Sequence, residues 1–225
     1  MLSLILVLLM SASSAGQEPA AQPPVIVASG HAVVKRAPDV AFITLAVESR
    51  AKGPRDAQRQ NAEVMAAVVK RMAELGIPKD ALQTVGLNLN EEVDTSNGRR
   101  VSRGFVARNS IEVQVDDIAR TGETADAGVA AGATSIGAIR FDTKGRAAAE
   151  REALRLAVAE ARARAEAMAA GAGRTIDRIL KIEEGGRVRP LPIQRSMAMR
   201  GEAITVVEAG LIELEADVTL TVSIK

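Results

Sequence analysis

The segment 212–224 constrains the fold more than any other part of the chain, because it alternates apolar and polar residues without interruption. Its apolar positions are Ile212, Leu214, Ala216, Val218, Leu220, Val222 and Ile224. Side chains of a strand point alternately to its two faces, so the pattern predicts a long strand with one buried face and one polar face. A strand of this length is prone to aggregate when its edges are unpaired. We therefore expect it inside a sheet or at a subunit contact.

Further strands are indicated by short runs that are rich in β-branched residues or alternate in polarity. They are expected at 25–34, 40–48, 82–93, 105–115, 135–141 and 176–182. The dipeptide Asn97-Gly98 lies between the third and fourth of these segments, and it is favoured in two-residue hairpin turns. The two segments are therefore predicted to form a β-hairpin.

Apolar residues at helical spacing predict two helices in the first part of the chain. The first begins at Pro54, because a first-turn position has no intrahelical partner for the N–H that proline lacks, and it ends at Gly76. The second helix follows Asp116 or Asp117, either of which can cap it, and ends near Gly132. Both helices lie between predicted strands.

A third and longer helix is predicted at 146–170. Its expected buried stripe is narrow and consists of Leu154, Ala157, Val158, Ala161, Ala165 and Met168. Two pairs of opposite charge, Glu160 with Arg164 and Arg162 with Glu166, are expected on its solvent side. The hairpins, half-polar strands and helices together predict an α+β fold, with a mixed, largely antiparallel sheet and about three helices packed on one face.

The N-terminus has the features of an export signal. Residues 2–10 are apolar, residues 11–15 are small, and residues 16–24 are rich in Pro, Ala and Gln. The apolar run is far shorter than the ~20 residues of a membrane-spanning helix, but it has the length of a signal-peptide core. The sequence therefore predicts export from the cytoplasm.

The same features predict how the chain is divided. We expect a signal peptide at 1–15, a flexible linker at 16–24, and one domain at 25–225 that contains an excursion loop at 185–202. No later segment is apolar over the length of a membrane span, so the mature protein is expected to be soluble and without a transmembrane helix.

Few side chains in this chain can carry catalysis at neutral pH. There is one histidine, His31, and there is no cysteine, tryptophan or tyrosine. Most enzymes rely on a group that titrates near neutral pH or on a strong nucleophile. We therefore predict no enzymatic activity, no catalytic residue and no cofactor. The net charge of +1 and the scarcity of aromatic residues also argue against a nucleic-acid partner.

Soft-metal binding is an alternative that the sequence leaves open. Met197 and Met199 place two thioethers two residues apart, an arrangement that suits a cuprous ion, and His31 is a third candidate ligand. The competing interpretations are a hydrophobic loop patch for the methionines and a strand-edge position for His31. We favour these interpretations, because no cysteine or second histidine completes a site of the usual type.

Arginines cluster in two expected loops. They are Arg99, Arg100, Arg103 and Arg108 beside the hairpin, and Arg187, Arg189, Arg195 and Arg200 in the excursion loop. Such arginines can contact anionic lipid head groups or peptidoglycan-linked polymers. Solvated arginine side chains are the interpretation that we favour.

Several residues and short motifs along the chain resemble those of one protein family. In order they are Val27-x-x-Gly30, Pro38-Asp39, Ala57, Asn61, Gly76-Ile77, Thr84, the run Phe-Val-Ala-Arg-Asn at 105–109, Gly132-Ala133 and Phe141. A long alanine-rich helix and a long final strand follow them. This order resembles the SIMPL-domain family, the group of periplasmic immunogenic and oxidative-stress defence proteins, over about 25–225.

The resemblance implies an exported protein that is linked to protection against oxidative stress, and it supplies no catalytic residues for this chain. Our first hypothesis is therefore a non-enzymatic periplasmic protein that acts in oxidative or envelope stress defence. It would act by self-assembly into a homo-oligomer or by binding envelope protein partners. The alternative hypothesis is a small-ligand or copper-binding module of the envelope.

Overall fold

The computed structural model describes residues 23–95, 100–185 and 207–225. Its strands are β1 (Val25–Arg36), β2 (Val40–Ala51), β3 (Leu82–Asp94), β4 (Val101–Val115), β5 (Ser135–Asp142), β6 (Ile176–Glu184) and β7 (Ile212–Ile224). Its α-helices are α1 (Pro54–Glu74), α2 (Thr121–Ala130) and α3 (Arg146–Gly171), with short 3-10 helices at Lys79–Ala81 and Ile118–Arg120. Every strand and helix that the sequence predicts is present at its expected place.

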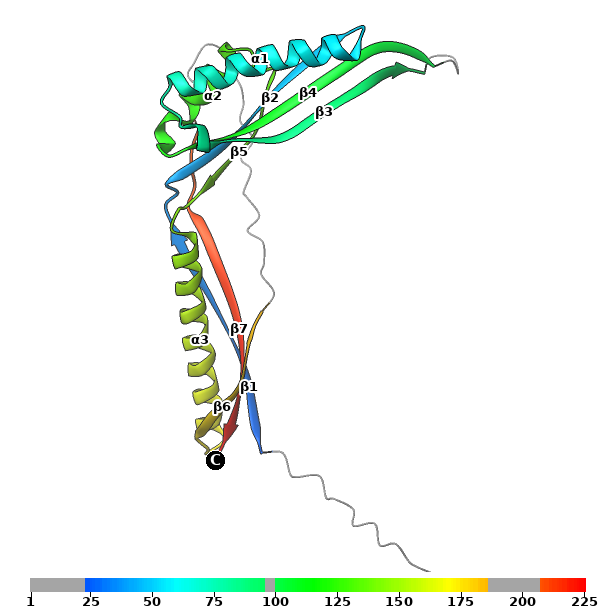
Figure 1. Ribbon diagram of the computed structural model, residues 1–225. Coiled ribbons are helices and arrows are strands. Elements are labelled where there is room, and N and C mark those ends of the chain that lie inside the picture. The colour runs from blue at the N-terminus through cyan, green and yellow to red at the C-terminus, as the bar shows by residue number, and fades with distance from the viewer. Residues whose placement is uncertain (1–22, 96–99, 186–206) are drawn as a thin grey trace, which may run out of the picture.

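The strands form two separate sheets, which lie end to end in Figure 1. Lobe A contains the sheet β1-β7-β6 with α3 on one face, and lobe B contains the sheet β3-β4-β2-β5 with α1 and α2. All of these strand pairs are antiparallel. Each lobe has its own cluster of buried apolar side chains. The α+β class is thus confirmed, and the strands expected in one sheet are divided between two.

The division occurs at two short connections. Residues 37–39 join β1 to β2, and a second connection joins β5 to α3. Pro38 has no N–H to donate to a strand ladder, which favours an interruption of the strand there. The two connections are tied together, because Asp39 N–H donates to Asp142 O at 3.1 Å and Lys144 N–H donates to Asp39 Oδ1 at 2.7 Å. Because the strand is interrupted at residues 37–39, β1 and β2 pair with different neighbours.

Lobe A depends on a close contact between α3 and its sheet. Every fourth residue along α3 is a buried alanine: Ala149, Ala153, Ala157, Ala161, Ala165 and Ala169. A Cβ atom placed on Gly30 of β1 would lie 2.1 Å from Ala157 O and 2.4 Å from Ala161 N. The backbone of the strand therefore rests directly on the backbone of the helix. β7, which the sequence places inside a sheet or at a subunit contact, is the central strand of this lobe.

The solvent side of α3 agrees with the sequence in its charges but not in one apolar residue. The expected ion pairs are present, with Glu160–Arg164 at 2.6 Å and Arg162–Glu166 at 2.9 Å. Met168, which was expected in the buried stripe, is 53% exposed. The buried line advances four residues at a time, so it drifts by about 40° around the helix at each step, and Met168 falls outside it.

Lobe B is a four-stranded sheet covered on one face by α1. The buried residues of α1 are Ala57, Asn61, Met65, Val68 and Met72. Asn61 Nδ2 donates to Val47 O of β2 at 2.8 Å and to Ala107 O of β4 at 2.9 Å, so one amide joins the helix to both central strands. β3 lies at the edge of the sheet, next to β4.

Two sequence predictions concern residues that the structure does not describe. The turn Asn97-Gly98 and most of the excursion loop, including Met197 and Met199, lie outside the described residues. The hairpin itself is confirmed, because β3 pairs antiparallel with β4 up to Asp94 opposite Val101. In the described ranges, no helix is both long enough and apolar enough to cross a membrane.

Candidate functional site

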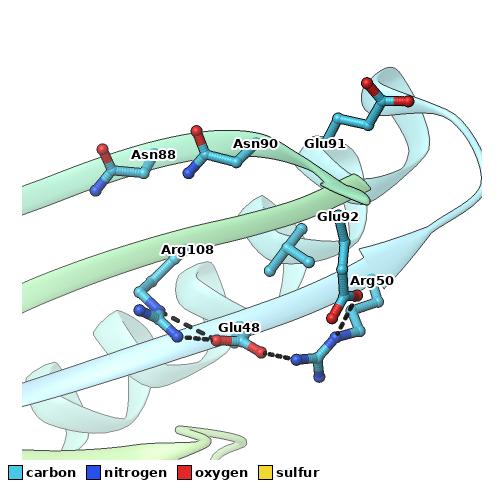
Figure 2. A pocket seen from close by; sticks show the side chains of 8 residues that line it. Glu48, Arg50, Asn88, Asn90, Glu91, Glu92 and Arg108 are labelled. Atoms are coloured by element: carbon cyan, nitrogen blue, oxygen red, sulfur yellow. Dashed lines mark hydrogen bonds and ion pairs between the residues drawn. The ribbon is translucent and has the colours of Figure 1, made fainter. Parts of the chain in front are cut away.

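A polar hollow of about 350 Å³ lies on the face of lobe B that α1 does not cover (Figure 2). Its lining residues come from three adjacent strands and are Glu48, Arg50, Asn88, Asn90, Glu91, Glu92, Val106 and Arg108. The volume is near the lower end of the ~300–1,000 Å³ typical of small-molecule pockets, but the lining is much more polar than is usual for them.

The strand register places these side chains in two rows. In the first row, Asn88 of β3 lies opposite Arg108 of β4, and Arg108 lies opposite Glu48 of β2. Two residues further along, Asn90 lies opposite Val106, which in turn lies opposite Arg50. Residues two apart on a strand share a face, so both rows point to the same side of the sheet.

A chain of ion pairs crosses the hollow. Arg108 donates to Glu48 Oε2 through Nε at 3.1 Å and through Nη2, while Arg50 Nη2 lies 2.7 Å from Glu48 Oε1. Arg50 Nε in turn lies 3.4 Å from Glu92 Oε2. Figure 2 shows Glu48 between the two guanidinium groups and Glu91 directed away from them.

Glu48 is the most enclosed charge of the hollow, with 17% of its side chain exposed. The hydrogen bond from Arg108 lowers the pKa of Glu48 below its ordinary value of 4.5, with further lowering from the charges of Arg50 and Arg108, while burial opposes this shift. The carboxylate is therefore ionised near neutral pH and holds both arginines in place.

The two asparagines stand beside this chain of charges. Asn88 and Asn90 lie along β3, and in the part of the chain that the structure describes no hydrogen bond is recorded for either side-chain amide. Val106 lies between Asn90 and Arg50 and is the apolar member of the lining. The site can thus offer amide and guanidinium donors, amide and carboxylate acceptors, and a small apolar surface.

His31 lies elsewhere, on the face of lobe A opposite α3. Its Nδ1 is 3.0 Å from Asp217 Oδ1, and the two side chains are 49% and 46% exposed. The neighbouring pair across the ladder, Ser29 and Thr219, joins its hydroxyl groups at 3.2 Å. Ser29 pairs with Thr219, and His31 pairs with Asp217. His31 therefore does not hold the hydroxyl of Ser29 in the way that a general base holds a catalytic nucleophile.

Of the three sequence-predicted metal candidates, the structure describes only His31. Within the described residues, no group of three or more His, Cys, Asp or Glu side chains is placed to hold a metal ion. Met197 and Met199 lie outside those residues, so their distance from His31 is not described. The position of His31 on β1, an edge strand, agrees with the strand-edge interpretation.

Among the described arginines beside the hairpin, Arg103 and Arg108 have separate partners. Arg103 pairs with Asp94, and Arg108 pairs with Glu48 in the hollow. Sequence analysis did not identify Glu48, Asn88 or Asn90 as site residues. The available signal was the alternation of Leu and Asn at 87–90, which places both amides on one face of a strand.

Comparison with known proteins gives a family and several relatives. The model of a family described as "SIMPL: Protein of unknown function (DUF541)" matches residues 26–222. The 26 kDa periplasmic immunogenic protein of Brucella melitensis is 31% identical over 180 residues, which cover 77% of this chain and 72% of that protein. Its counterpart in Brucella abortus is 30% identical over the same shares.

A more distant relative is the uncharacterized protein YggE of Escherichia coli, 26% identical over 116 residues, which cover 52% of this chain and 47% of that protein. The names of the Brucella relatives state a periplasmic location, and this confirms the location that the family resemblance implies. None of the three names describes an enzyme.

Proposed function

Because this chain belongs to the SIMPL family, whose function is unknown, we propose its function from its own surface. It is a non-enzymatic periplasmic protein that acts in oxidative or envelope stress defence by assembling with further copies of itself. The observation that carries the proposal is the free edge of β3. The link to stress defence rests on the family resemblance.

The edge of β3 presents apolar side chains to solvent. Val85, Leu87 and Leu89 are 51%, 63% and 41% exposed, and within the described ranges no strand lies beyond β3. Natural proteins usually protect long edge strands with charges or prolines, and β3 has neither between Leu82 and Asn90. A bulge at Val85 is its one irregularity in that stretch.

The sequence of β3 is complementary to itself. Antiparallel pairing of two copies around Asn88 sets Leu87 opposite Leu89 of the second copy and Asn88 opposite its own equivalent. Glu91 then faces Val85 of the second copy, so like charges do not meet. A two-fold interface of this kind uses the same residues on both subunits and closes after two copies. Backbone hydrogen bonds along the edge would add to the apolar contact.

The test is the solution mass of the chain from Gly16 onward, measured by light scattering behind a sizing column. We expect a discrete oligomer that is lost in the double variant Leu87→Lys/Leu89→Lys. Leu156→Lys is the matched control, because Leu156 is a 48% exposed leucine on α3, and it is expected to keep the wild-type mass. A monomeric wild-type chain would overturn the assembly proposal. An oligomer that both variants retain would place the interface away from β3.

The stress role is tested in cells. A strain that lacks the protein is expected to survive peroxide less well, and the wild-type gene is expected to restore survival. If assembly is required, the Leu87→Lys/Leu89→Lys variant fails to restore it at equal protein level. Unchanged survival of the deletion strain would contradict the stress role and leave the assembly result intact.

A small-ligand or soft-metal module is the second candidate function. The polar hollow on lobe B favours ligand binding, whereas copper binding depends on Met197 and Met199. Titration with cuprous ion separates the two. Stoichiometric binding that is lost in the double variant Met197→Ala/Met199→Ala would support a copper module, and no binding would remove it.

A further inference from the structure

The hollow on lobe B has a polar rim around an apolar centre. The chain of ion pairs Arg108–Glu48–Arg50–Glu92 passes around Val106, and Asn88 and Asn90 complete the rim along β3. We propose that this hollow binds an uncharged saccharide, with a sugar ring over Val106 and its hydroxyl groups on the rim. This inference goes beyond the assembly proposal and does not depend on it.

The charges of the rim favour a neutral ligand. Both guanidinium groups are already in contact with carboxylates, so Glu48 and Glu92 balance the two cations, and Glu91 adds a third carboxylate to the lining. An anionic ligand such as phosphate is held best by arginines that are free to form paired hydrogen bonds with it. Here it would have to displace Glu48 or Glu92, and it would be repelled by the carboxylate that remained.

The rim nevertheless keeps hydrogen-bonding capacity. A guanidinium has five N–H donors, and the recorded contacts of Arg50 and Arg108 use Nε and Nη2, so each Nη1 remains available. The amides of Asn88 and Asn90 supply both donors and acceptors. A sugar hydroxyl also donates and accepts, so it can bond with every group on this rim.

The arrangement fits a sugar better than a peptide. An extended peptide binds a sheet mainly through backbone hydrogen bonds along a strand edge, in the plane of the sheet. The lining residues of the hollow instead stand on the face of three paired strands, and the backbone groups of the two inner strands, β4 and β2, are bonded to neighbouring strands on both sides. A sugar ring has an apolar C–H face and polar edges, which match an apolar centre and a polar rim.

The ion pairs also prepare the site. Glu48 holds both guanidinium groups in fixed positions before any ligand arrives, so less conformational entropy is lost on binding. The described lining contains no aromatic ring on which a sugar could stack, so affinity is expected to be modest. A method that detects weak binding is therefore required.

The experiment is a nuclear magnetic resonance titration of the 15N-labelled chain from Gly16 onward. The probes are N,N′-diacetylchitobiose and cellobiose, with inorganic phosphate and a triglycine peptide as comparisons. We expect saturable shifts with at least one sugar for the side-chain amides of Asn88 and Asn90, the Nε–H of Arg50 and Arg108, and the backbone of Val106. The double variant Asn88→Ala/Asn90→Ala is expected to weaken binding about tenfold or more, since two hydrogen-bonding amides are lost.

Gln58→Ala is the matched control, because it removes an exposed amide from α1 and leaves the hollow intact; it is expected to bind as the wild type does. Unchanged resonances outside the hollow show that each variant is folded. The proposal is overturned if neither sugar gives saturable shifts, or if the asparagine variant binds as well as the wild type. Saturable shifts with only phosphate or the peptide would also overturn it and would assign the hollow to that class.

Discussion

At the scale of single residues, Gly30 is the glycine with the closest backbone contact in the described part of the chain. Its Cα faces the backbone of α3 between Ala157 and Ala161, with no room for a methyl group. The atoms that a Cβ would meet are backbone atoms of a helix, which cannot move aside as a flexible side chain can. A strand residue normally adds a side chain to the core, but here the absence of one determines how closely the two layers approach.

Gly30→Ala is therefore expected to destabilise the protein by about 3 kcal/mol, through overpacking that forces β1 and α3 apart. Urea unfolding measures the change. Gly171→Ala is the matched control: a Cβ there would have no neighbour within 4 Å, so we expect a change of less than about 1 kcal/mol. Equal stability of Gly30→Ala and the wild type would show that the contact between strand and helix is looser than described.

At the scale of elements, the hollow shows how three strands combine single charges into one unit. Glu48 on β2 holds one arginine from its own strand and one from β4, and Arg50 reaches Glu92 on β3. Isolated surface ion pairs contribute little to stability, but a network around a largely enclosed carboxylate contributes more. The same network links three strands of lobe B on the face opposite α1.

The lowered pKa of Glu48 predicts a pH dependence with a defined sign. Because its pKa is lower in the folded state, its ionised form stabilises the fold above about pH 4.5, and this contribution is lost as the pH falls through the folded-state pKa. Glu48→Gln is expected to cost about 1 kcal/mol at pH 7 and less at pH 3, as measured by urea unfolding at both values.

Glu166→Gln is the control for this comparison, since Glu166 forms a single exposed ion pair with Arg162 on α3. Its substitution is expected to change stability by less than about 0.5 kcal/mol at either pH. A cost of Glu48→Gln that was the same at pH 7 and pH 3 would mean that ionisation of Glu48 does not stabilise the fold.

Elements with strong local signals were predictable from the sequence, whereas their arrangement was not. Pro54 and Gly76 mark the ends of α1 closely, and Gly76 has the positive φ of +81° that favours glycine after a helix. The division into two sheets depends on which strands pair, and local pattern carries no information on pairing partners. The hollow was missed for the same reason, because Glu48 and Asn88 become neighbours only through the register of β2, β4 and β3.

At the scale of the whole molecule, the two lobes have separate cores. The buried cluster of lobe B includes Ile43, Leu45 and Val113, while that of lobe A is formed by α3, β1 and β7. The connections after β1 and after β5 join them and are tied together through Asp39, and at this junction Arg146 of α3 also pairs with Asp142 of β5. Each lobe can therefore be perturbed separately.

Hydrogen exchange measured by mass spectrometry tests this independence. Gly30→Ala is expected to speed exchange in β1, β7 and α3 while β2 to β5 stay protected. Asn61→Ala removes the amide that joins α1 to β2 and β4, so the opposite pattern is expected. Faster exchange in both lobes of both variants would show that the molecule opens as a single unit.

The pairing of β1 with β7 brings together residues that are far apart along the chain, such as Ser29 and Thr219, and at the end of the same ladder Ile224 N–H donates to Pro24 O. Lobe B is formed from one continuous stretch between these two strands. A chain that enters its compartment N-terminus first can therefore complete lobe B before β7 is available to pair with β1. Lobe A has the higher contact order, because β1 must pair with β7 from the far end of the chain. Its closure is therefore the slower step of folding. During that delay the unpaired edges of β1 are exposed to other chains and to chaperones, so the order of emergence sets the period in which misassembly competes with folding.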